Sequence, residues 1–321
     1  MAITINSSPQ KYSPSNNPNI WTISSNSSSI VYFLVDVKDT VTSNIITTLK
    51  FYPSPVTPLS SSFNLQTVLK NLVNAQLVND NVVVQPITTG IKSYRLKITE
   101  KLLVNGSIYD GTVLENTSDA YYYWDAELPD AYFNYYNSNE FVVTSGRTNN
   151  FLTSKPNNSY VHFWSTEYLY FINQVGTGLN KVVIKTYNAA GLKATYNSVI
   201  TFGSNIMFRI NVSPKSLQFS LTIDYTGVNY YTVELQTSTG TVLSSVRTFK
   251  CIDVKCHKEP VNILWENEYG GYDSFSGFIN PQETINVTQT SISKYNYGVN
   301  ASGVYSNING GIRNAEDVTI N

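Results

Sequence analysis

The feature that most constrains the fold is an alternation of apolar and polar residues with a period of two. Runs rich in valine, isoleucine, threonine and aromatic residues follow it, and groups of asparagine, serine, glycine and proline separate them. Such alternation is typical of half-buried β-strands, and strands at intervals of roughly 8–12 residues favour a sandwich or barrel. We predict strands over residues 2–6, 19–24, 29–37, 47–52, 93–99, 141–144, 168–173, 181–187, 193–201, 204–211, 216–225, 229–236 and 244–251.

Two segments depart from the alternation. The spacing i, i+3, i+4, i+7 predicts a short amphipathic helix over residues 64–75. The segment 53–58 contains three prolines, which lack the donor that a central strand needs. The helical spacing is that of Leu65, Val68, Leu69 and Leu72.

The length of 321 residues, at about 150 residues per domain, predicts two domains. The polar stretch 145–150 marks the boundary, which gives domains over residues 1–148 and 149–278. After about Gly277 apolar residues become sparse, so residues 279–321 are predicted to form a tail without a core, ordered only by a partner. The predicted fold is mostly β: two β-sandwich-like domains, immunoglobulin-like or jelly-roll-like, with one short helix and an extended C-terminal tail.

Composition narrows the classes of partner. The formal charge is −1, and only 13% of residues are charged, so no strong field attracts a polyanion. The chain has no apolar run of membrane-spanning length, and 13% aromatic residues argue against disorder. We therefore expect neither nucleic-acid readout nor a membrane partner. The first residues lack the cationic and apolar regions of a secretion signal, which predicts synthesis in a host cytoplasm.

The residues that most often perform catalysis are few. The only histidines are His162 and His257, and neither lies in a pattern that would make it a general base. Cys251, Cys256 and His257 cannot complete a four-ligand zinc site, and no glycine-rich phosphate loop occurs. We therefore expect no catalytic residue, no metal and no cofactor, and a protein that is not an enzyme.

Two groups of carboxylates keep a hydrolase as an alternative. A glycosidase needs two carboxylates across a cleft with aromatic rings that stack on sugars, and a tyrosine-rich run adjoins Asp125. Carbohydrate binding is a second alternative, and packing or a subunit interface is a third. The carboxylates are Asp125, Glu127, Asp130, Glu266, Glu268 and Asp273. The candidate interface or glycan-stacking residues are Tyr121, Tyr122, Tyr123, Trp124, Tyr132, Tyr135 and Tyr136.

The most specific segment runs from Cys251 to Phe278. It reads as a strand that leads into a tight turn, in which Gly270 and Gly271 permit positive φ and close backbone approach. Asp273 is predicted to bond a nearby backbone amide. The residues of this structural turn motif are Asn267, Gly270, Gly271, Tyr272, Asp273 and Phe275.

Three segments carry a resemblance to a known family. They are the Cys-x4-Cys and Glu259-Pro260-Val261 region with its Gly-Gly-Tyr-Asp-Ser-Phe turn, the opening stretch Ser8–Pro18 followed by Trp21, and the stretch Phe151–Pro156. Together they resemble virion structural proteins of tailed phages that infect Bacteroidetes, including the crAss-like group. Two features depart from the family pattern: less acidic residues are expected at the positions of Glu266 and Glu268, and Gly277 interrupts the apolar–polar alternation after Phe275.

The resemblance implies β-sandwich domains built into a neck, tail or ring-like assembly. The predicted function is a structural protein of a phage virion, forming a homo-oligomeric ring or collar and docking to neighbouring neck or tail proteins. The ring would be twelve-fold if it matches a portal. The alternative is a receptor- or glycan-binding virion protein associated with tail or head fibres. Either function places the mature protein in the virion.

Overall fold

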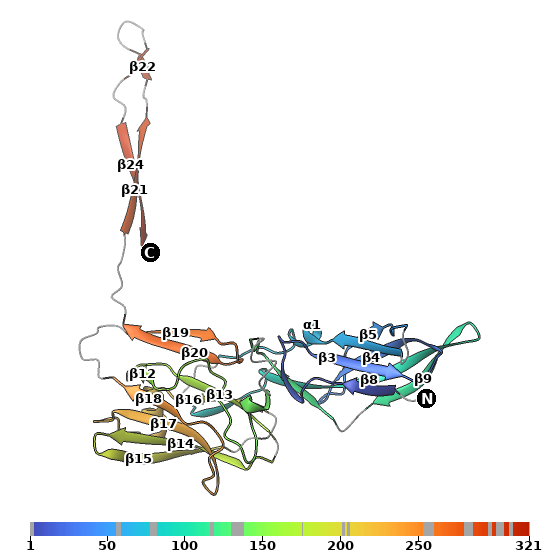
Figure 1. The fold of residues 1–321 in the computed structure, drawn as a ribbon. Helices are drawn as coiled ribbons and strands as arrows, with labels where there is room; N and C mark the ends of the chain where they lie inside the picture. The colour runs from blue at the N-terminus through green and yellow to red at the C-terminus, as the bar shows by residue number, and fades with distance from the viewer. Residues whose placement is uncertain are drawn as a thin grey trace. The chain divides into compact units, whose positions relative to one another are not determined.

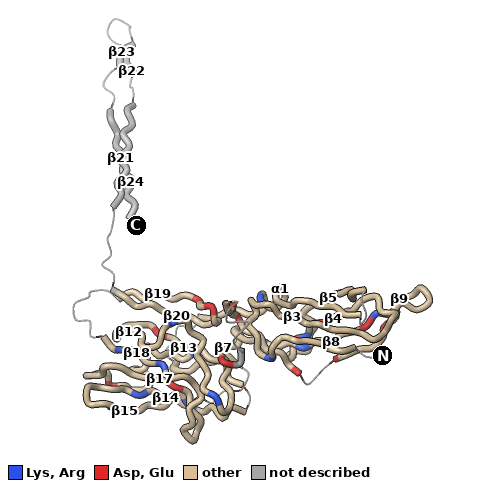
Figure 2. Tube along the Cα trace, viewed as in Figure 1, with Lys and Arg blue, Asp and Glu red and all other residues tan. Residues whose placement is uncertain are grey.

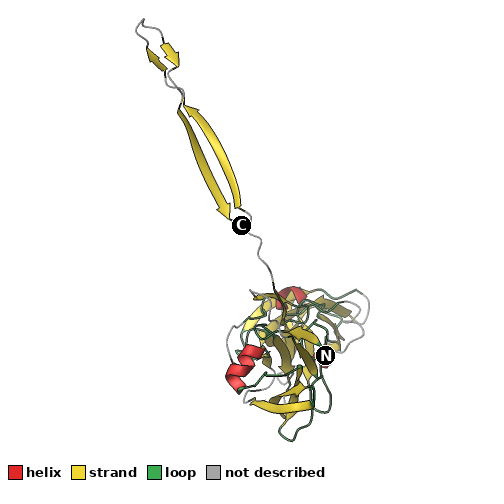
Figure 3. Cartoon of the chain, turned by 90° about the vertical axis from the view of Figure 1, so that its left-hand side faces the viewer, coloured by secondary structure: helices red, strands yellow, loops and turns green. Residues whose placement is uncertain are grey.

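The computed structural model describes residues 3–320 apart from 56–58, 78–81, 116–118, 130–137, 175, 201–202, 204–205, 253–259, 279–284, 295–296, 300–304 and 308–310. The chain divides into two units, Met1–Gly277, here called unit 1, and Phe278–Asn321. Strands predominate in both units (Figure 3), so the predicted mostly-β class is confirmed. No helix in the described residues is long and apolar enough to cross a membrane.

The first sandwich of unit 1 packs a three-stranded sheet on a six-stranded sheet. The smaller sheet has the order β1 (Ile3–Ser7), β3 (Ile20–Ser25), β6 (Leu59–Asn64). The larger has the order β2 (Tyr12–Pro14), β10 (Tyr121–Trp124), β8 (Ile91–Val104), β4 (Ile30–Asp39), β5 (Ile45–Phe51), with β9 (Ser107–Glu115) also paired to β8 (Figure 1). Trp21, Ile23, Phe33, Val35 and Tyr94 are among the buried residues between the two sheets.

The second sandwich pairs a four-stranded sheet with a five-stranded sheet. The four-stranded order is β11 (Val142–Val143), β13 (Tyr168–Asn173), β16 (Ile206–Asn211), β7 (Val84–Ile87). The five-stranded order is β12 (Ser159–Val161), β18 (Arg247–Cys251), β17 (Tyr230–Thr237), β14 (Leu179–Asn188), β15 (Gly191–Val199). Phe171, Phe208, Ile184 and Tyr231 are fully buried in this core.

The two sandwiches share residues, which corrects the domain boundary predicted at residue 148. Strands β7 and β11 precede that residue, yet both belong to the four-stranded sheet of the second sandwich. A third core draws on both sandwiches and includes Tyr12, Trp124, Leu152 and Tyr170. Unit 1 is therefore one packed body and not two self-contained domains.

A last hairpin of unit 1 covers this third core. Its strands are β19 (Pro260–Glu266) and β20 (Tyr272–Phe278), which form a two-stranded sheet of their own. Leu264, Tyr269 and Tyr272 of the hairpin pack against the third core. The hairpin thus contacts the region where the two sandwiches meet.

The helices differ from the prediction. The helix expected over 64–75 is only α1 (Gln66–Leu69), followed by turns. The strand expected over 216–225 is wrong, because α3 (Pro214–Leu221) occupies that segment. Pro214 stands at the first helical position, where its missing N–H costs nothing. In a strand, Leu217 and Phe219 would lie on the same face. Leu217 is buried while Phe219 is 76% exposed, so the apparent alternation is not that of a strand. A 3₁₀ helix, η1, spans Ser138–Phe141.

The second unit is a ribbon of antiparallel strands. β21 (Ile285–Lys294) pairs with β24 (Gly311–Ile320) from Ile285 opposite Ile320 to Lys294 opposite Gly311. Further out, β22 (Tyr297–Val299) pairs with β23 (Tyr305–Asn307). The extended C-terminal tail is therefore confirmed, but its strands were not predicted. We call residues 285–320 the C-terminal ribbon.

Candidate functional site

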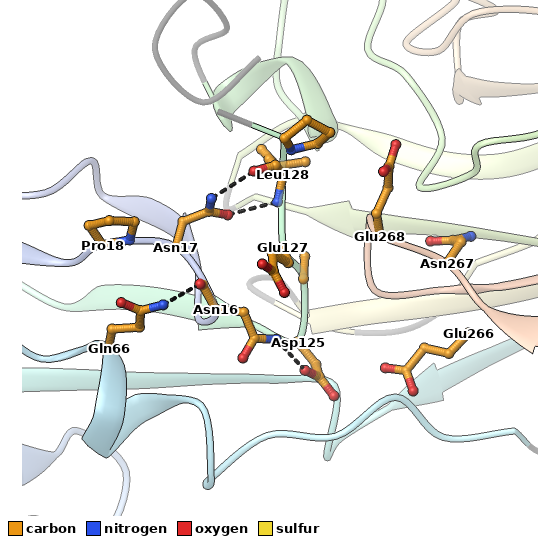
Figure 4. A pocket seen from close by; sticks show the side chains of 12 residues that line it. Asn16, Asn17, Pro18, Gln66, Asp125, Glu127, Leu128, Glu266, Asn267 and Glu268 are labelled. Carbon is orange, nitrogen blue, oxygen red and sulfur yellow. Dashed lines mark hydrogen bonds between the residues drawn. The ribbon is translucent and has the colours of Figure 1, made fainter. Parts of the chain in front are cut away.

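Two carboxylates from each of the groups noted in the sequence meet at one cavity of unit 1; Asp273 does not line it, and Asp130 lies outside the described residues. Asp125 and Glu127 follow strand β10, Glu266 ends β19, and Glu268 lies in the turn to β20. The cavity measures about 810 Å³, and Figure 4 shows these side chains around it. Figure 2 shows acidic residues gathered at this end of β19 and β20. The lining residues are Asn16, Asn17, Pro18, Gln66, Asp125, Ala126, Glu127, Leu128, Pro129, Glu266, Asn267 and Glu268. We call this space the acidic cavity.

Asp125 is the best-anchored carboxylate of the acidic cavity. Its Oδ1 accepts a hydrogen bond from Asn16 Nδ2 at 3.2 Å, and its Oδ2 accepts one from the Ala75 backbone N–H at 2.9 Å. Partial burial raises the pKa of Glu266, and the negative charge of Asp125 and a hydrogen bond to it raise that pKa further. No lysine or arginine is among the described lining residues. The negative charge of Asp125 therefore favours the protonated form of Glu266.

The amide side chains of the acidic cavity are engaged by the chain itself. Asn17 Nδ2 donates to the Leu128 carbonyl at 2.7 Å, and the Leu128 N–H donates to Asn17 Oδ1 at 2.7 Å. Gln66 Nε2 donates to the Asn16 carbonyl. The first two bonds tie the loop after β2 to the chain after β10, and the third ties that loop to α1. Nothing in the sequence placed Asn16, Asn17 or Gln66 beside the carboxylates, because hydrogen bonds between residues 50 or more apart leave no local pattern.

The acidic cavity lacks the features of a metal or sugar site. Among the described residues no group of three or more His, Cys, Asp or Glu side chains is arranged to hold a metal ion. No aromatic ring is among the lining residues, so no stacking platform for a sugar faces the carboxylates.

The turn between β19 and β20 has the predicted glycine chemistry at one position and close packing at the other. Gly270 has φ +86°, and a Cβ built there would lie 2.0 Å from the Asp125 carbonyl oxygen. Gly271 does not have positive φ, but its Cβ would lie 2.8 Å from the Leu152 carbonyl oxygen. The expectation of positive φ is therefore confirmed for Gly270 and wrong for Gly271, where close approach alone requires glycine.

Asn267 organises the same turn. Its Oδ1 accepts hydrogen bonds from the backbone N–H groups of Tyr269 at 2.9 Å and Gly271 at 3.2 Å. Its Nδ2 donates to the Leu152 carbonyl at 3.2 Å. Asn267 is buried, so these bonds satisfy polar groups that water cannot reach.

Asp273 joins the turn motif to the segment at 151–156. Its carboxylate accepts hydrogen bonds from Thr153 Oγ1 at 2.5 Å, from the Ser154 N–H at 2.9 Å and from Ser154 Oγ at 2.7 Å. The prediction that Asp273 bonds a backbone amide is confirmed. Two segments that the sequence singled out separately are therefore one structural contact.

Lys155 extends that contact. Its Nζ lies 2.6 Å from Glu167 Oε2 and donates to Ser274 Oγ at 3.3 Å. Burial raises the pKa of Glu167, and the charge of Lys155 opposes that rise. The ion pair lies beneath the hairpin and holds β20 to the loop before β13.

The tyrosine run of β10 does not form a stacking or interface surface. Tyr123 and Trp124 are fully buried, and Trp124 Nε1 donates to the Tyr269 carbonyl at 3.0 Å. The half-buried Tyr122 stacks on Tyr12 with 4.9 Å between ring centroids. Tyr121 meets Trp21 edge-on at 4.7 Å. Tyr123 and Trp124 are therefore unavailable to the predicted surface, because their rings are buried in cores, whereas Tyr121 and Tyr122 stay half-buried. Tyr132, Tyr135 and Tyr136 lie outside the described residues.

The remaining candidate residues are placed as follows. Burial raises the pKa of the half-buried Cys251 thiol to about 11, so the thiol is protonated at neutral pH. Burial lowers the pKa of His162. Cys256 and His257 lie outside the described residues. Phe275 is 61% exposed on β20.

Comparisons with known proteins add no family. No family model matches the chain, and no curated protein matches it. Similar solved structures include a marsupial T cell receptor, at 8% identity and TM-score 0.23 over 100% of this chain and 99% of that chain. A bacterial ice-binding adhesin is 12% identical with TM-score 0.23, over 99% of this chain and 96% of that chain. Scores of this size carry no argument about function.

Proposed function

We propose that this chain is a structural subunit of a tailed-phage particle. It forms a homo-oligomeric ring or collar in the neck or tail and docks to neighbouring virion proteins. The proposal begins from the sequence resemblance to virion proteins of phages that infect Bacteroidetes. It assigns the protein no catalytic role and no cofactor, and it places the protein in the virion.

The observation that carries the proposal is the C-terminal ribbon. Its strands β21 and β24 are ten residues each and, among the described residues, pair only with one another. A two-stranded ribbon is marginally stable by itself in water, since it has no second layer to bury a face. A segment of this kind is suited to a protein that works in contact with neighbours.

The polar groups of unit 1 support the same proposal. Asp273, Asn267 and Lys155 bind parts of the chain to one another, and the ring systems of β10 fill cores. The convergence of Asp125 with Glu266 is the observation that favours a hydrolase. Yet no aromatic ring is among the described lining residues of the acidic cavity, and a glycosidase needs rings that stack on the sugar. A structural role therefore accounts for more of the polar and aromatic groups of unit 1 than a hydrolase does.

The experiment is identification of the chain in purified particles. Mass spectrometry of particles banded on a density gradient should find this chain in fixed proportion to the capsid protein, and a map of the particle should show it as a ring. A phage enzyme of DNA replication serves as the control that must be absent from the same band. Absence of the chain from intact particles would overturn the proposal.

A further inference from the structure

The C-terminal ribbon has two outer edges, and their backbone groups are the starting point. In an antiparallel pair each strand directs alternate N–H and C=O groups to its partner and the others outward. Because β21 and β24 pair only with each other among the described residues, both strands leave an outward row of donors and acceptors. An unpaired row of this kind is a template for another strand.

The two edges differ in how they are protected by charge. Strand β24 carries Arg313, Glu316 and Asp317, and charges on an edge strand oppose further pairing. Strand β21 has no proline and no glycine, and its one charged residue is Lys294 at its end. The open edge of the ribbon is therefore β21.

Unit 1 offers one edge of matching length and character. β15 is the outermost strand of the five-stranded sheet, is nine residues long and pairs with β14 alone among the described strands. It has no proline, and its one charged residue is Lys193, near its start. Other outermost strands of unit 1 have two to seven residues, namely β1, β2, β5, β6, β7, β11, β12, β19 and β20. β9 also has nine residues, but it carries two charged residues, Asp110 and Glu115, whereas β15 carries one.

We propose that β21 of one copy pairs with the outer edge of β15 in a second copy and extends its five-stranded sheet. The inference deepens the proposed function, on which it rests, by naming the two surfaces that join subunits. The contact is heterologous, since each copy gives one edge and receives at another. Repeated head to tail, such a contact closes into a ring when the rotation between copies allows it.

Hydrogen exchange of the full chain tests the pairing directly. Amide exchange is followed by mass spectrometry at a concentration where the chain is monomeric and at one where it is assembled. We expect assembly to slow exchange in β21 and β15 together, while β24 and β9 keep their monomer rates. Protection of β21 without β15, or protection that does not depend on concentration, would overturn the proposal, because it would indicate another partner or pairing within one chain.

Lysine substitutions supply matched variants. Thr290 of β21 lies opposite Ala315 of β24, so Thr290→Lys and Ala315→Lys place the same charge at one level of the ribbon on its two edges. On unit 1, Asn197→Lys alters β15 and Ser107→Lys alters an exposed site of β9. We expect Thr290→Lys and Asn197→Lys to raise the concentration needed for assembly about tenfold or more.

The two control variants should leave that concentration unchanged. Equal effects of Thr290→Lys and Ala315→Lys in sedimentation velocity would contradict the choice of β21. This measurement is separate from the test of the proposed function. A chain that is absent from particles but shows the paired protection would refute the virion assignment and leave the strand pairing in place.

Discussion

Single backbone positions join the last hairpin of unit 1 to the rest of it. At Gly270 two requirements coincide, a left-handed φ and the contact that a Cβ would make with the Asp125 carbonyl oxygen. At Gly271 only the contact matters, because a Cβ there would clash with the Leu152 carbonyl oxygen and the Tyr170 ring. Each glycine therefore touches a different part of the chain, one after β10 and one before β13.

Gly270→Ala separates the two requirements when it is compared with Gly146→Ala. Gly146 has φ +78° with nothing within 4 Å of a built Cβ, so alanine there meets backbone strain alone, about 1 kcal/mol. Gly270→Ala adds the clash and should cost about 3 kcal/mol or more of unfolding free energy. Urea unfolding measures both variants. Equal costs would show that the hairpin moves freely away from Asp125.

Glu266 stabilises the folded chain at low pH, and this stabilisation is lost as pH rises. Its pKa is raised in the folded chain, so its contribution is complete below the ordinary value of 4.5 and is lost as pH rises through the folded pKa. Glu167, whose pKa is also raised, acts in the same direction. Unfolding midpoints in urea should therefore fall less steeply above pH 4.5 in Glu266→Gln than in the unaltered chain.

Groups with lowered pKa, among them Asp39 and Glu115, contribute to stability in the opposite direction. Because Glu266→Gln and the unaltered chain both contain these groups, their contributions cancel when the two proteins are compared. Parallel curves for Glu266→Gln and the unaltered chain would show that burial and the charge of Asp125 do not raise the pKa of Glu266.

Elements were predictable from sequence where alternation and burial agreed. Strand β13 matches the prediction at both ends, and all six of its residues are buried. Strand β9 was missed although Asn105 and Gly106, both at positive φ, are a hairpin signal before it. Strand β7 has four residues and joins its sheet through β16, about 120 residues away. Such long-range pairing has no local trace, and the acidic cavity was hidden for the same reason.

The end of α3 permits a stabilising substitution. Thr222 caps the helix at φ +54°, a region that a β-branched residue enters at a cost. Thr222→Gly should raise the unfolding free energy by about 0.5–1 kcal/mol, because glycine adopts this conformation without steric strain.

Asn158→Gly, at φ +66°, is the control with a smaller gain, since asparagine tolerates the left-handed region. Thermal unfolding of Thr222→Gly, Asn158→Gly and the unaltered chain gives the order of their stabilities. A loss of stability in Thr222→Gly would show that its hydroxyl bond to the Leu221 carbonyl outweighs the strain.

Asp273→Ala tests the contact between β20 and the loop at 153–155. The substitution removes a buried carboxylate that accepts hydrogen bonds from the Ser154 N–H and from two hydroxyl groups, so it should cost about 3 kcal/mol. Asp224→Ala removes a solvent-exposed partner of Lys193 and should change the urea midpoint little. Comparable midpoints for the two variants would mean that the hairpin is held by apolar packing alone.

At the scale of the whole molecule, unit 1 and the C-terminal ribbon have different sources of stability. Unit 1 has three cores, and the sheet of its second sandwich is completed by β7 from the first half of the sequence. The ribbon has ladders between strand pairs and no other described sheet. Loss of the ribbon should therefore affect assembly and leave the folding of unit 1 intact.

Truncation after Phe278 tests that separation. The shortened chain should keep a β-type far-ultraviolet spectrum and a cooperative thermal transition close to that of the full chain, because all three cores remain. It should not enter phage particles, since it lacks the strand proposed to join neighbouring copies. The full chain carrying Ala315→Lys is the control for an altered but present ribbon. Normal incorporation of the truncated chain would show that the ribbon is a passive extension and that the assembly contacts lie on unit 1.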